Sequence, residues 1–269
     1  MKNQWFIAVK KRGKDIFDFS NMSAIMPPTG RYYADPFLYD HDGKTYVFIE
    51  DYDYKKGVIS CFELNDDLSY TEPKIVLERN YHISYPFLYK EGNELYMIPE
   101  TGMNQQMELF KCKEFPNKWE FVKPLFKSLM ASDINILENQ GLLYLTTTIK
   151  PDFDNNCALF IAKDSILNEF EFAGWEYIKD SRPAGNVFIY DGEEIPECKG
   201  KLIQPTQNCG ERYGYGMKFR ELNVTEDQYD NEKIIHEIWP DWTEGIIGTH
   251  TFNFNDKFVI TDGKRRINE

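Results

Sequence analysis

The stretch Ala34–Asp51, ADPFLYDHDGKTYVFIED, predicts a β-hairpin with acidic residues at its open end. Two runs rich in aromatic and β-branched residues flank the dipeptide Asp42-Gly43, which favours a tight hairpin turn. Asp35 and Glu50 are equally far from this turn, so we expect them to be cross-strand neighbours. Two carboxylates should therefore face one end of this hairpin.

The hairpin pattern recurs along the chain. The further copies are SYPFLYKEGNELYMIPE at 84–100, SDINILENQGLLYLTTT at 132–148, AGNVFIYDG at 184–192 with a return strand LIQPTQ after an insertion, and GTHTFNFNDKFVITDG at 248–263. The turn glycines Gly43, Gly92 and Gly141 are 49 residues apart. A repeat of this length built from short strands is typical of a β-propeller. The sequence therefore predicts an all-β fold, a single five-bladed β-propeller domain over residues 1–269 with about four antiparallel strands per blade.

The segments between the hairpins supply the other strands of each blade. Residues 57–64 and 74–77 read as the third and fourth strands of the first unit, and residues 106–113 and 119–122 play the same parts in the second. Residues 164–170, DSILNEF, are the only candidate for a short helix. We expect the strand around Trp5–Val9 to pair with the last blade, which would close the ring and remove an exposed sheet edge.

Composition limits the class of partner. The chain has 42% hydrophobic residues, enough for a core, and a formal net charge of −13. This balance argues against nucleic-acid binding and against an anionic membrane surface, since both require basic patches. A neutral or cationic partner, or one held by hydrogen bonds, fits better.

The remaining sequence signals favour a cytoplasmic protein without membrane insertion. The apolar run Trp5–Val9 is too short for the core of an export signal, and no run approaches the length of a membrane-spanning helix. The five cysteines are scattered and form no CxxC pair. Such a pattern is typical of reduced thiols rather than of disulfides or a zinc site.

Propeller geometry predicts that the repeated hairpins together form one candidate site. The first strand of each blade lines the central channel, so equivalent positions of successive hairpins should form a ring at one mouth. The residues expected there are Asp35, Glu50, Tyr85, Glu100, Asp133, Arg182, Gln207 and His250, together with Asp262. Carboxylates that share one cleft push their pKa values apart, which is the condition for one acid and one base at neutral pH.

Each of these residues also has a purely structural interpretation. An Asp before Pro often serves as a turn or cap residue, and a Glu at a strand end can simply be solvated. His250 could be a hydrogen-bonded core histidine, and Arg182 could pair structurally with a carboxylate of the ring. The tyrosines that lead the hairpins are more often blade-packing residues than platforms for sugar stacking.

Taken in order, six motifs resemble a known family. They are ADPFLYDHDGKTYVFIED, YHISYPFLYKEGNELYMIPET, SDINILENQGLLYL, RPAGNVFIYDG, QPTQNCGERYGYGMKF and GTHTFNF. Together they are similar to the glucosamine inositolphosphorylceramide transferase N-terminal-type domain, a five-bladed propeller related to glycoside hydrolase family 43. The resemblance covers about residues 33–264. It implies a carbohydrate-active role in building or trimming a surface polysaccharide or glycolipid.

The resemblance also implies roles for single residues. Asp35 matches the first-blade Asp that acts as general base or nucleophile in the wider glycosidase clan, and Asp133 matches the third-blade Asp that orients the acid. The clan's general acid is a Glu at the start of the fourth blade, where this chain reads SRPAGNVF without a carboxylate. Glu100 is the nearest candidate to replace it. Relatives often hold a cation on the channel axis near a histidine, a part that His250 could play, but the sequence supplies no ligand set for a metal, so no cofactor is predicted.

Three hypotheses remain open. The first is an enzyme that hydrolyses or transfers at a glycosidic bond, with Asp35, Glu100 and Asp133 as catalytic residues. Its predicted substrate-binding residues are Glu50, Tyr85, Arg182, Gln207, Arg212, Tyr213 and His250. The second is a non-catalytic propeller that binds a glycan or nucleotide sugar and serves a partner glycosyltransferase of glycan biosynthesis. The third is a protein-interaction scaffold whose channel carboxylates are dispensable.

Overall fold

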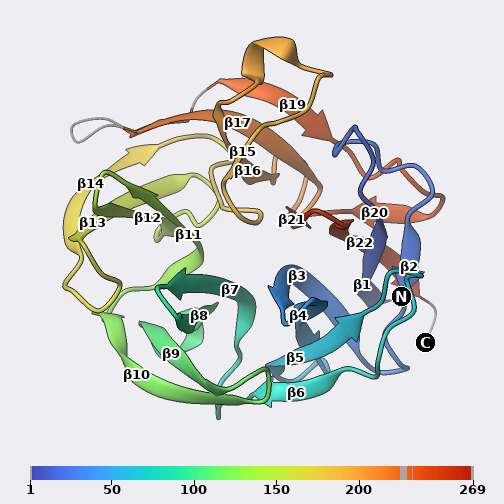
Figure 1. Ribbon diagram of the computed structural model, residues 1–269, viewed down its shortest axis with the longest axis horizontal. Coiled ribbons are helices and arrows are strands. Elements are labelled where there is room, and N and C mark those ends of the chain that lie inside the picture. Colours follow the sequence, from blue (N-terminus) through green and yellow to red (C-terminus); the bar gives the residue numbers. More distant parts are fainter. Residues whose placement is uncertain (1, 225–228, 232, 268–269) are drawn as a thin grey trace.

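Five β-sheets are arranged around a central channel, as the sequence predicts (Figure 1). The computed structural model describes residues 2–224, 229–231 and 233–267. Within these residues the regular secondary structure consists of β-strands, apart from two 3-10 turns. No helix in these ranges has the length and apolar character needed to cross a membrane.

The first three blades each consist of four antiparallel strands that follow one another in sequence. Blade 1 contains β3 (Tyr32–His41), β4 (Lys44–Tyr52), β5 (Gly57–Leu64) and β6 (Lys74–Leu77). Blade 2 contains β7 (Ser84–Glu91), β8 (Glu94–Glu100), β9 (Gln106–Glu114) and β10 (Lys118–Lys127), with the 3-10 turn η1 (Gly102–Asn104) between its middle strands. Blade 3 contains β11 (Ala131–Asn139), β12 (Leu142–Ile149), β13 (Asn156–Lys163) and β14 (Glu171–Tyr177).

The last two blades are less regular. Blade 4 contains β15 (Phe188–Ile189), the 3-10 turn η2 (Pro196–Cys198), β16 (Leu202–Asn208), β17 (Gly216–Val224), β18 (Tyr229–Asp230) and β19 (Ile234–Ile238). Blade 5 contains β20 (Ile246–Gly248), β21 (Phe252–Phe254) and β22 (Phe258–Ile267), and it is completed by β1 (Lys2–Lys11) and β2 (Ser23–Ile25).

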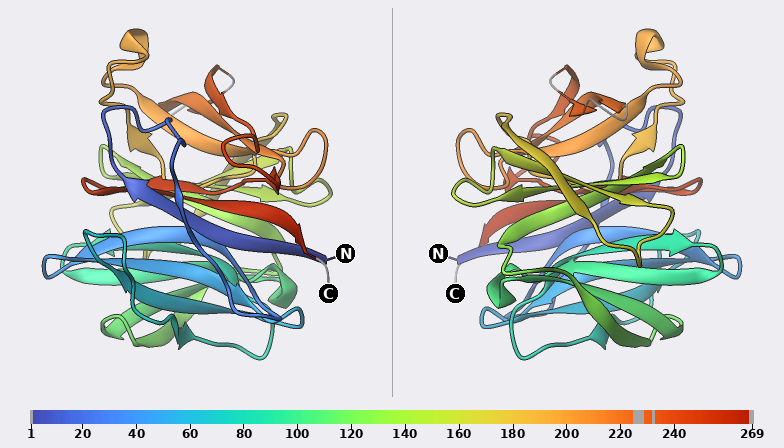
Figure 2. Two further views of the ribbon diagram at one scale, coloured as in Figure 1. Left: turned by 90° about the vertical axis from the view of Figure 1, so that its right-hand side faces the viewer. Right: turned by 90° about the vertical axis from the view of Figure 1, so that its left-hand side faces the viewer.

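The strands β1 and β22 close the ring, which confirms the expected closure. They pair antiparallel along their whole length, from Lys2 opposite Ile267 to Lys11 opposite Phe258. Figure 2 shows the two strands, blue and red, side by side across the molecule. Blade 5 therefore draws its strands from both ends of the chain, and the edge of β22 that faces away from β20 and β21 is paired with β1.

The blades pack through aromatic and aliphatic side chains. Phe37 of blade 1 is fully buried and meets Tyr85 and Phe87 of blade 2 edge to face, with ring centroids 4.9 and 6.1 Å apart. Burying one such ring stabilises the fold by about 1.5–3 kcal/mol. Because Phe37 follows Asp35 by two residues, the same strand that supplies a polar side chain to the mouth also anchors its blade to the next one.

Residues 164–170, predicted as a short helix, form turns instead. The backbone amide of Ile166 donates to Glu91, and the amide of Leu167 donates to the Ser165 hydroxyl. The Asn168 side chain donates back to the Lys163 carbonyl. Side chains that bind nearby backbone groups in this way offer the chain an alternative to helical hydrogen bonds, and here that alternative prevails.

Candidate functional site

Three inner strands and the segment before β15 share one backbone irregularity at the channel mouth. Asp35, Tyr85, Asp133 and Gly185 have positive φ angles of 51°, 45°, 52° and 126°. In the first three blades each such residue lies in a register shift between the two strands of its hairpin. A β-bulge of this kind turns a side chain out of the regular alternation and is common beside active sites.

The bulge corrects one expectation. Ala34, not Asp35, lies opposite Glu50, because the register shifts between Ala34 and Phe37. The extra residues in the bulge displace Asp35 from the position that a symmetric hairpin would give it.

Carboxylates connect successive blades at these bulges. Asp262 of blade 5 accepts a hydrogen bond of 3.2 Å from the amide of Asp35 in blade 1. Asp35 in turn accepts one of 3.2 Å from the amide of Tyr85 in blade 2, and its other oxygen accepts from the Thr251 hydroxyl at 2.8 Å. The Tyr85 hydroxyl then accepts from the amide of Gly185 in blade 4, across the channel. The mouth is therefore held together by side chain to backbone bonds between blades.

A second group of residues links blades 2, 3 and 4. The Arg182 guanidinium donates to Asp133 at 2.6 Å and lies 3.3 Å from Glu100. Gln207 donates its amide N–H to the same Asp133 oxygen at 2.8 Å. Asp133 is buried, whereas the Glu100 side chain keeps 19% of its surface exposed. Glu100 is thus the most accessible carboxyl group of this cluster.

A third group surrounds His250. Its Nδ1 lies 2.6 Å from Asp262 and 3.8 Å from Asp35. Trp5, from the closing strand β1, stacks on the imidazole with ring centroids 4.0 Å apart. The ligand atoms of Asp35, His250 and Asp262 lie within 4.8 Å of one another, a spacing that could hold a cation. Each of these residues also has a protein hydrogen-bond partner.

Glu50 occupies a separate sector of the mouth in blade 1. The Tyr32 hydroxyl donates to it at 3.1 Å, and His82 Nε2 lies 3.2 Å from the same oxygen. The amide of Gly57 donates to His82 Nδ1, which leaves the proton of a neutral ring on Nε2, facing Glu50. Glu50 is therefore buried among donors rather than solvated.

The shared environment separates the proton affinities of the carboxyl groups. Burial raises the pKa of Asp35 to about 6, with the negative charges of Asp133 and Asp262 adding to the rise and His250 opposing it. Burial and the negative charge of Asp133 raise the pKa of Glu100 to about 8, although Arg182 opposes the shift. Burial also raises the pKa of Glu50 well above its usual range. Near neutral pH Asp35 is mostly ionised and Glu100 mostly holds its proton.

The structure brings together most of the residues predicted for the mouth. Tyr85 and Gln207 are fully buried, so they lie beneath the surface of the mouth and support it. Tyr213 is 44% exposed and lies beneath the Arg182 guanidinium, 5.0 Å from its ring centroid. Arg212 lies further out, where its guanidinium donates to the Ile247 carbonyl.

Sequence reasoning missed four residues around this site. Tyr32 and His82 flank Glu50, and Trp5 and Lys264 adjoin His250 and Tyr213. Trp5 could have been found, because the first strand was expected to complete the last blade. Tyr32 is the first residue of β3 and His82 lies just before β7, and no repeat pattern marks either position.

Gly185 explains why the fourth hairpin carries no acid. A Cβ atom at this position would lie 1.9 Å from the Phe252 carbonyl oxygen, closer than any real contact. The positive φ angle of 126° adds strain for any other residue. The inner edge of blade 4 therefore has no room for a side chain at position 185.

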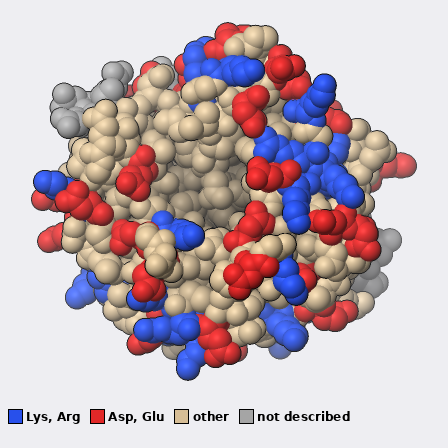
Figure 3. Space-filling view, in the orientation of Figure 1, with Lys and Arg blue, Asp and Glu red and all other residues tan. Residues whose placement is uncertain are grey.

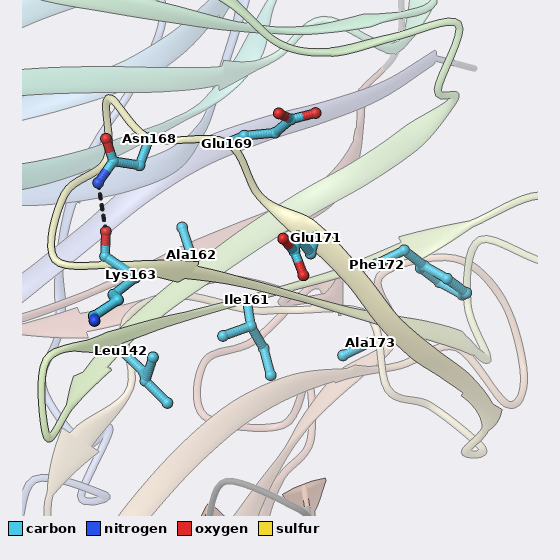
Figure 4. A pocket seen from close by; sticks show the side chains of 9 residues that line it. All are labelled: Leu142, Ile161, Ala162, Lys163, Asn168, Glu169, Glu171, Phe172 and Ala173. Carbon is cyan, nitrogen blue, oxygen red and sulfur yellow. Dashed lines mark hydrogen bonds between the residues drawn. The ribbon is translucent and has the colours of Figure 1, made fainter.

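Another pocket among the described residues contains none of the carboxylates of the mouth. A pocket of about 360 Å³ lies on blade 3, lined by residues of β12 to β14 such as Leu142, Ile161 and Phe172 (Figure 4). None of the predicted site residues lines it. Figure 3 shows one face of the propeller with a central hollow, around which acidic side chains separate small groups of basic ones. The channel mouth with its carboxylates is therefore the candidate site.

Comparison with known proteins places the chain in a family. The family model described as glucosamine inositolphosphorylceramide transferase 1, N-terminal, matches residues 16–241. Glucosamine inositolphosphorylceramide transferase 1 of Arabidopsis thaliana is 28% identical over 209 residues, which are 71% of this chain and 25% of that protein. The Oryza sativa subsp. indica protein of the same name is 25% identical over 213 residues, 73% of this chain and 27% of that protein. The chain thus spans about a quarter of the length of these relatives.

Solved structures share the propeller architecture at low sequence identity. An α-L-arabinofuranosidase from Podospora anserina in complex with cellotriose superposes with a TM-score of 0.63 at 10% identity, over 90% of this chain and 94% of that one. A family 43 β-xylosidase/α-arabinofuranosidase from a compost microbial metagenome, in complex with xylotriose, has a TM-score of 0.58 at 13% identity, over 87% of each chain. At these identities the likeness establishes the fold alone. The family model covers most of the sequence, and on that basis the chain belongs to the family of glucosamine inositolphosphorylceramide transferase 1 N-terminal domains.

Proposed function

We propose that the channel mouth binds a carbohydrate and acts on a glycosidic bond, by hydrolysis or by glycosyl transfer. The observation that carries this proposal is the pairing, in one mouth, of Asp35 with a pKa of about 6 and Glu100 with a pKa of about 8. One group that is mostly ionised and one that is mostly protonated are what acid and base catalysis at neutral pH requires. Family membership and the sugar-binding enzymes that share the fold add support.

In this proposal Glu100 donates its proton to the oxygen of the departing group. Asp35 either attacks the anomeric carbon or removes a proton from the attacking water or acceptor hydroxyl. Asp133 and Arg182 are positioning residues, because they hold Glu100 between a negative and a positive charge. Glu100 keeps its proton because the negative charge of Asp133 disfavours a second negative charge nearby.

Glu50 is the less suitable acid. Although its pKa is also raised, its side chain is only 7% exposed and it accepts a hydrogen bond from Tyr32. Glu100 is the more accessible of the two, with 19% of its side chain exposed. A sugar at the mouth would therefore meet Glu100 more readily.

Product analysis tests this proposal. The chain is incubated with a panel of p-nitrophenyl glycosides and of nucleotide sugars, with and without acceptor glycans, and the products are separated by chromatography. Asp35→Asn and Glu100→Gln should each reduce turnover at least about 100-fold, the usual contribution of an acid or base. Glu94→Gln and Asp66→Asn serve as matched controls, because these carboxylates form exposed pairs with lysines away from the mouth. Full activity in either site variant would refute the assignment.

A second candidate function is supported by Gly185. Because blade 4 has no room for the acid of the wider clan, the same mouth could bind a glycan or nucleotide sugar without chemistry and present it to a partner glycosyltransferase. The relatives are about four times as long as the matched segment, so they contain further chain that could supply such activity. Saturable binding with no product in the same screen would favour this function.

We further propose that the protein acts in the cytoplasm. The five cysteines, free in the structure, support a reducing compartment. Fractionation of the source cells, followed by detection of the native protein with an antibody, tests the location. Recovery from a secreted or extracytoplasmic fraction would contradict it.

A further inference from the structure

One sector of the mouth is cationic and aromatic, in contrast to the carboxylates beside it. Lys264, on β22, places its ammonium 5.0 Å from the ring centroid of Trp5 and 5.8 Å from that of Tyr213. Among the residues that the structure describes, no carboxylate lies within 4.0 Å of this ammonium. Aromatic faces stabilise a cation, but they do not neutralise it.

A second cation is held in the same sector. Arg212 lies in the connection between β16 and β17, where its Nε and Nη2 donate to the Ile247 carbonyl at 3.1 and 2.6 Å. Its guanidinium stacks over Tyr215, 4.5 Å from the ring centroid. Nη1 lies 3.6 Å from Glu211, which is itself exposed, so this pair neutralises little charge.

The backbone fixes the connection that carries Arg212 and Tyr213. Gly214 has a φ angle of 65°, and a Cβ atom there would lie 2.8 Å from Trp5 and 3.0 Å from the His250 ring. The Gly214 carbonyl also accepts a hydrogen bond from the Thr249 amide. Tyr213 and Arg212 are therefore held against blade 5 beside Lys264, and their position does not depend on a ligand.

This arrangement is unfavourable for the free protein. Burial lowers the pKa of Lys264, and the positive charge of Arg212 lowers it further. Like charges kept together in a partly desolvated place are stabilised when an anion binds between them. The Tyr213 ring adjoins Lys264, whereas its hydroxyl interacts electrostatically with Arg182 and with the carboxyl groups of Asp35, Asp133 and Glu100. Two cations thus face the space beside the carboxylates.

We propose that Lys264 and Arg212, beside the ring of Tyr213, form a subsite for an oxyanion, a phosphate or a carboxylate, carried by the sugar that binds at the mouth. Arg182 does not belong to this subsite, because its guanidinium is already committed to Asp133 and Glu100. The inference rests on the proposed carbohydrate function and specifies the class of sugar. It differs from the expectation of a neutral or cationic partner, or one held by hydrogen bonds, which followed from the net charge of −13.

The proposed subsite would select sugars by the position of their negative charge. An anionic sugar placed with its oxyanion at Lys264 and Arg212 keeps that charge beside two cations rather than beside Asp35 and Glu100. A sugar bound the other way round would bring its anion against the carboxylates, which repel it. The acidic and cationic sectors would therefore orient the substrate as well as select it.

Calorimetric titration tests the subsite with defined probes. Glucose, glucose 1-phosphate, glucuronic acid and inorganic phosphate are titrated into the unmodified chain, into Lys264→Met and into Arg212→Gln. Lys111→Met is the matched control, because its ammonium is paired with Glu94 on an outer face of blade 2. We expect at least one anionic probe to bind at least about tenfold more tightly than glucose, and this advantage to weaken as salt is added. Lys264→Met should remove most of the advantage, Arg212→Gln part of it, and Lys111→Met none.

The probes separate the two kinds of anion. A gain for glucose 1-phosphate or inorganic phosphate identifies a phosphate subsite, and a gain for glucuronic acid alone identifies a carboxylate subsite. If no anion binds in a manner that depends on Lys264, the subsite is refuted, provided that circular dichroism shows the variant to be folded. Lys264→Arg should restore the anion preference. Asp35→Asn should retain it while losing turnover, so failure of the subsite is distinguishable from failure of the proposed reaction.

Discussion

Arg182 donates a hydrogen bond of 2.6 Å to Asp133, a residue that lies 49 positions earlier in the chain and in the preceding blade. Both side chains are largely removed from solvent, with 13% and 3% of their surface exposed. Arg182 therefore carries a charge that the interior of the mouth needs, since Asp133 and Glu100 would otherwise face each other without a cation.

Arg182→Met should destabilise the fold by about 3–5 kcal/mol, because removal of one partner leaves buried carboxyl groups without their counter-charge. Chemical denaturation monitored by tryptophan fluorescence measures this change. Lys111→Met, which removes a partner from an exposed pair, should cost no more than about 1 kcal/mol. Equal effects of the two variants would show that Arg182 is not needed to balance the mouth.

The pH–rate profile of the proposed reaction should be bell-shaped. Asp35 must be ionised, so activity rises as the pH increases through about 6, and Glu100 must be protonated, so activity falls as the pH increases through about 8. Because the two groups interact, these limits belong to the pair. The kcat/KM profile measures them. Arg182→Met should move the alkaline limb to higher pH, since Arg182 favours the ionised form of Glu100, and an unmoved limb would assign that limb to another group.

Gly185→Ala should be strongly destabilising. The new Cβ would overlap the Phe252 carbonyl oxygen at 1.9 Å, so blades 4 and 5 would have to separate. Gly245→Ala is the matched control, since Gly245 also has a positive φ, 82°, but has open space around it. We expect a loss of about 1 kcal/mol for Gly245→Ala and several times more for Gly185→Ala. Thermal unfolding of the two variants measures these losses of stability. Similar losses would mean that the contact with Phe252 is easily relaxed.

Tyr85→Phe isolates one hydrogen bond of the mouth. The substitution keeps the buried ring but leaves the Gly185 amide without its acceptor, at a cost of about 1–3 kcal/mol. Tyr96→Phe is a suitable control, because Tyr96 is also buried and its hydroxyl has no hydrogen bond to any residue that the structure describes. The free energies of unfolding should differ between the two variants. A neutral result for Tyr85→Phe would indicate that the Gly185 amide finds another partner.

Much of the fold could be predicted from the sequence because the repeat is local. Each hairpin has its own turn, and strand alternation determines which residues face the channel. The third and fourth strands of blades 1 and 2 also lie where the local residue pattern predicts them. Residues 164–170 could not be predicted in this way. Their conformation depends on Glu91 of another blade, which accepts the Ile166 amide, and no local pattern reveals that contact.

The site was less predictable than the fold. Hairpin symmetry brought Asp35, Glu100 and Asp133 to one mouth, but it placed Asp35 opposite Glu50, and the bulge after Ala34 overturns that register. Tyr32, His82 and Lys264 acquire their roles from contacts with other elements, so their own sequence neighbourhoods give no signal. The lack of space for a side chain at Gly185 is likewise caused by Phe252, a residue of another blade.

The pairing of β1 with β22 also governs when the site can exist during synthesis. Trp5 is synthesised long before the His250 ring on which it stacks. Asp35 must likewise wait for Asp262 and Thr251. Such contacts between distant parts of a chain form slowly, since a long loop must close first. A nascent chain that has not yet reached Asp262 holds the earlier blades but no finished mouth, so it cannot bind the proposed ligand there.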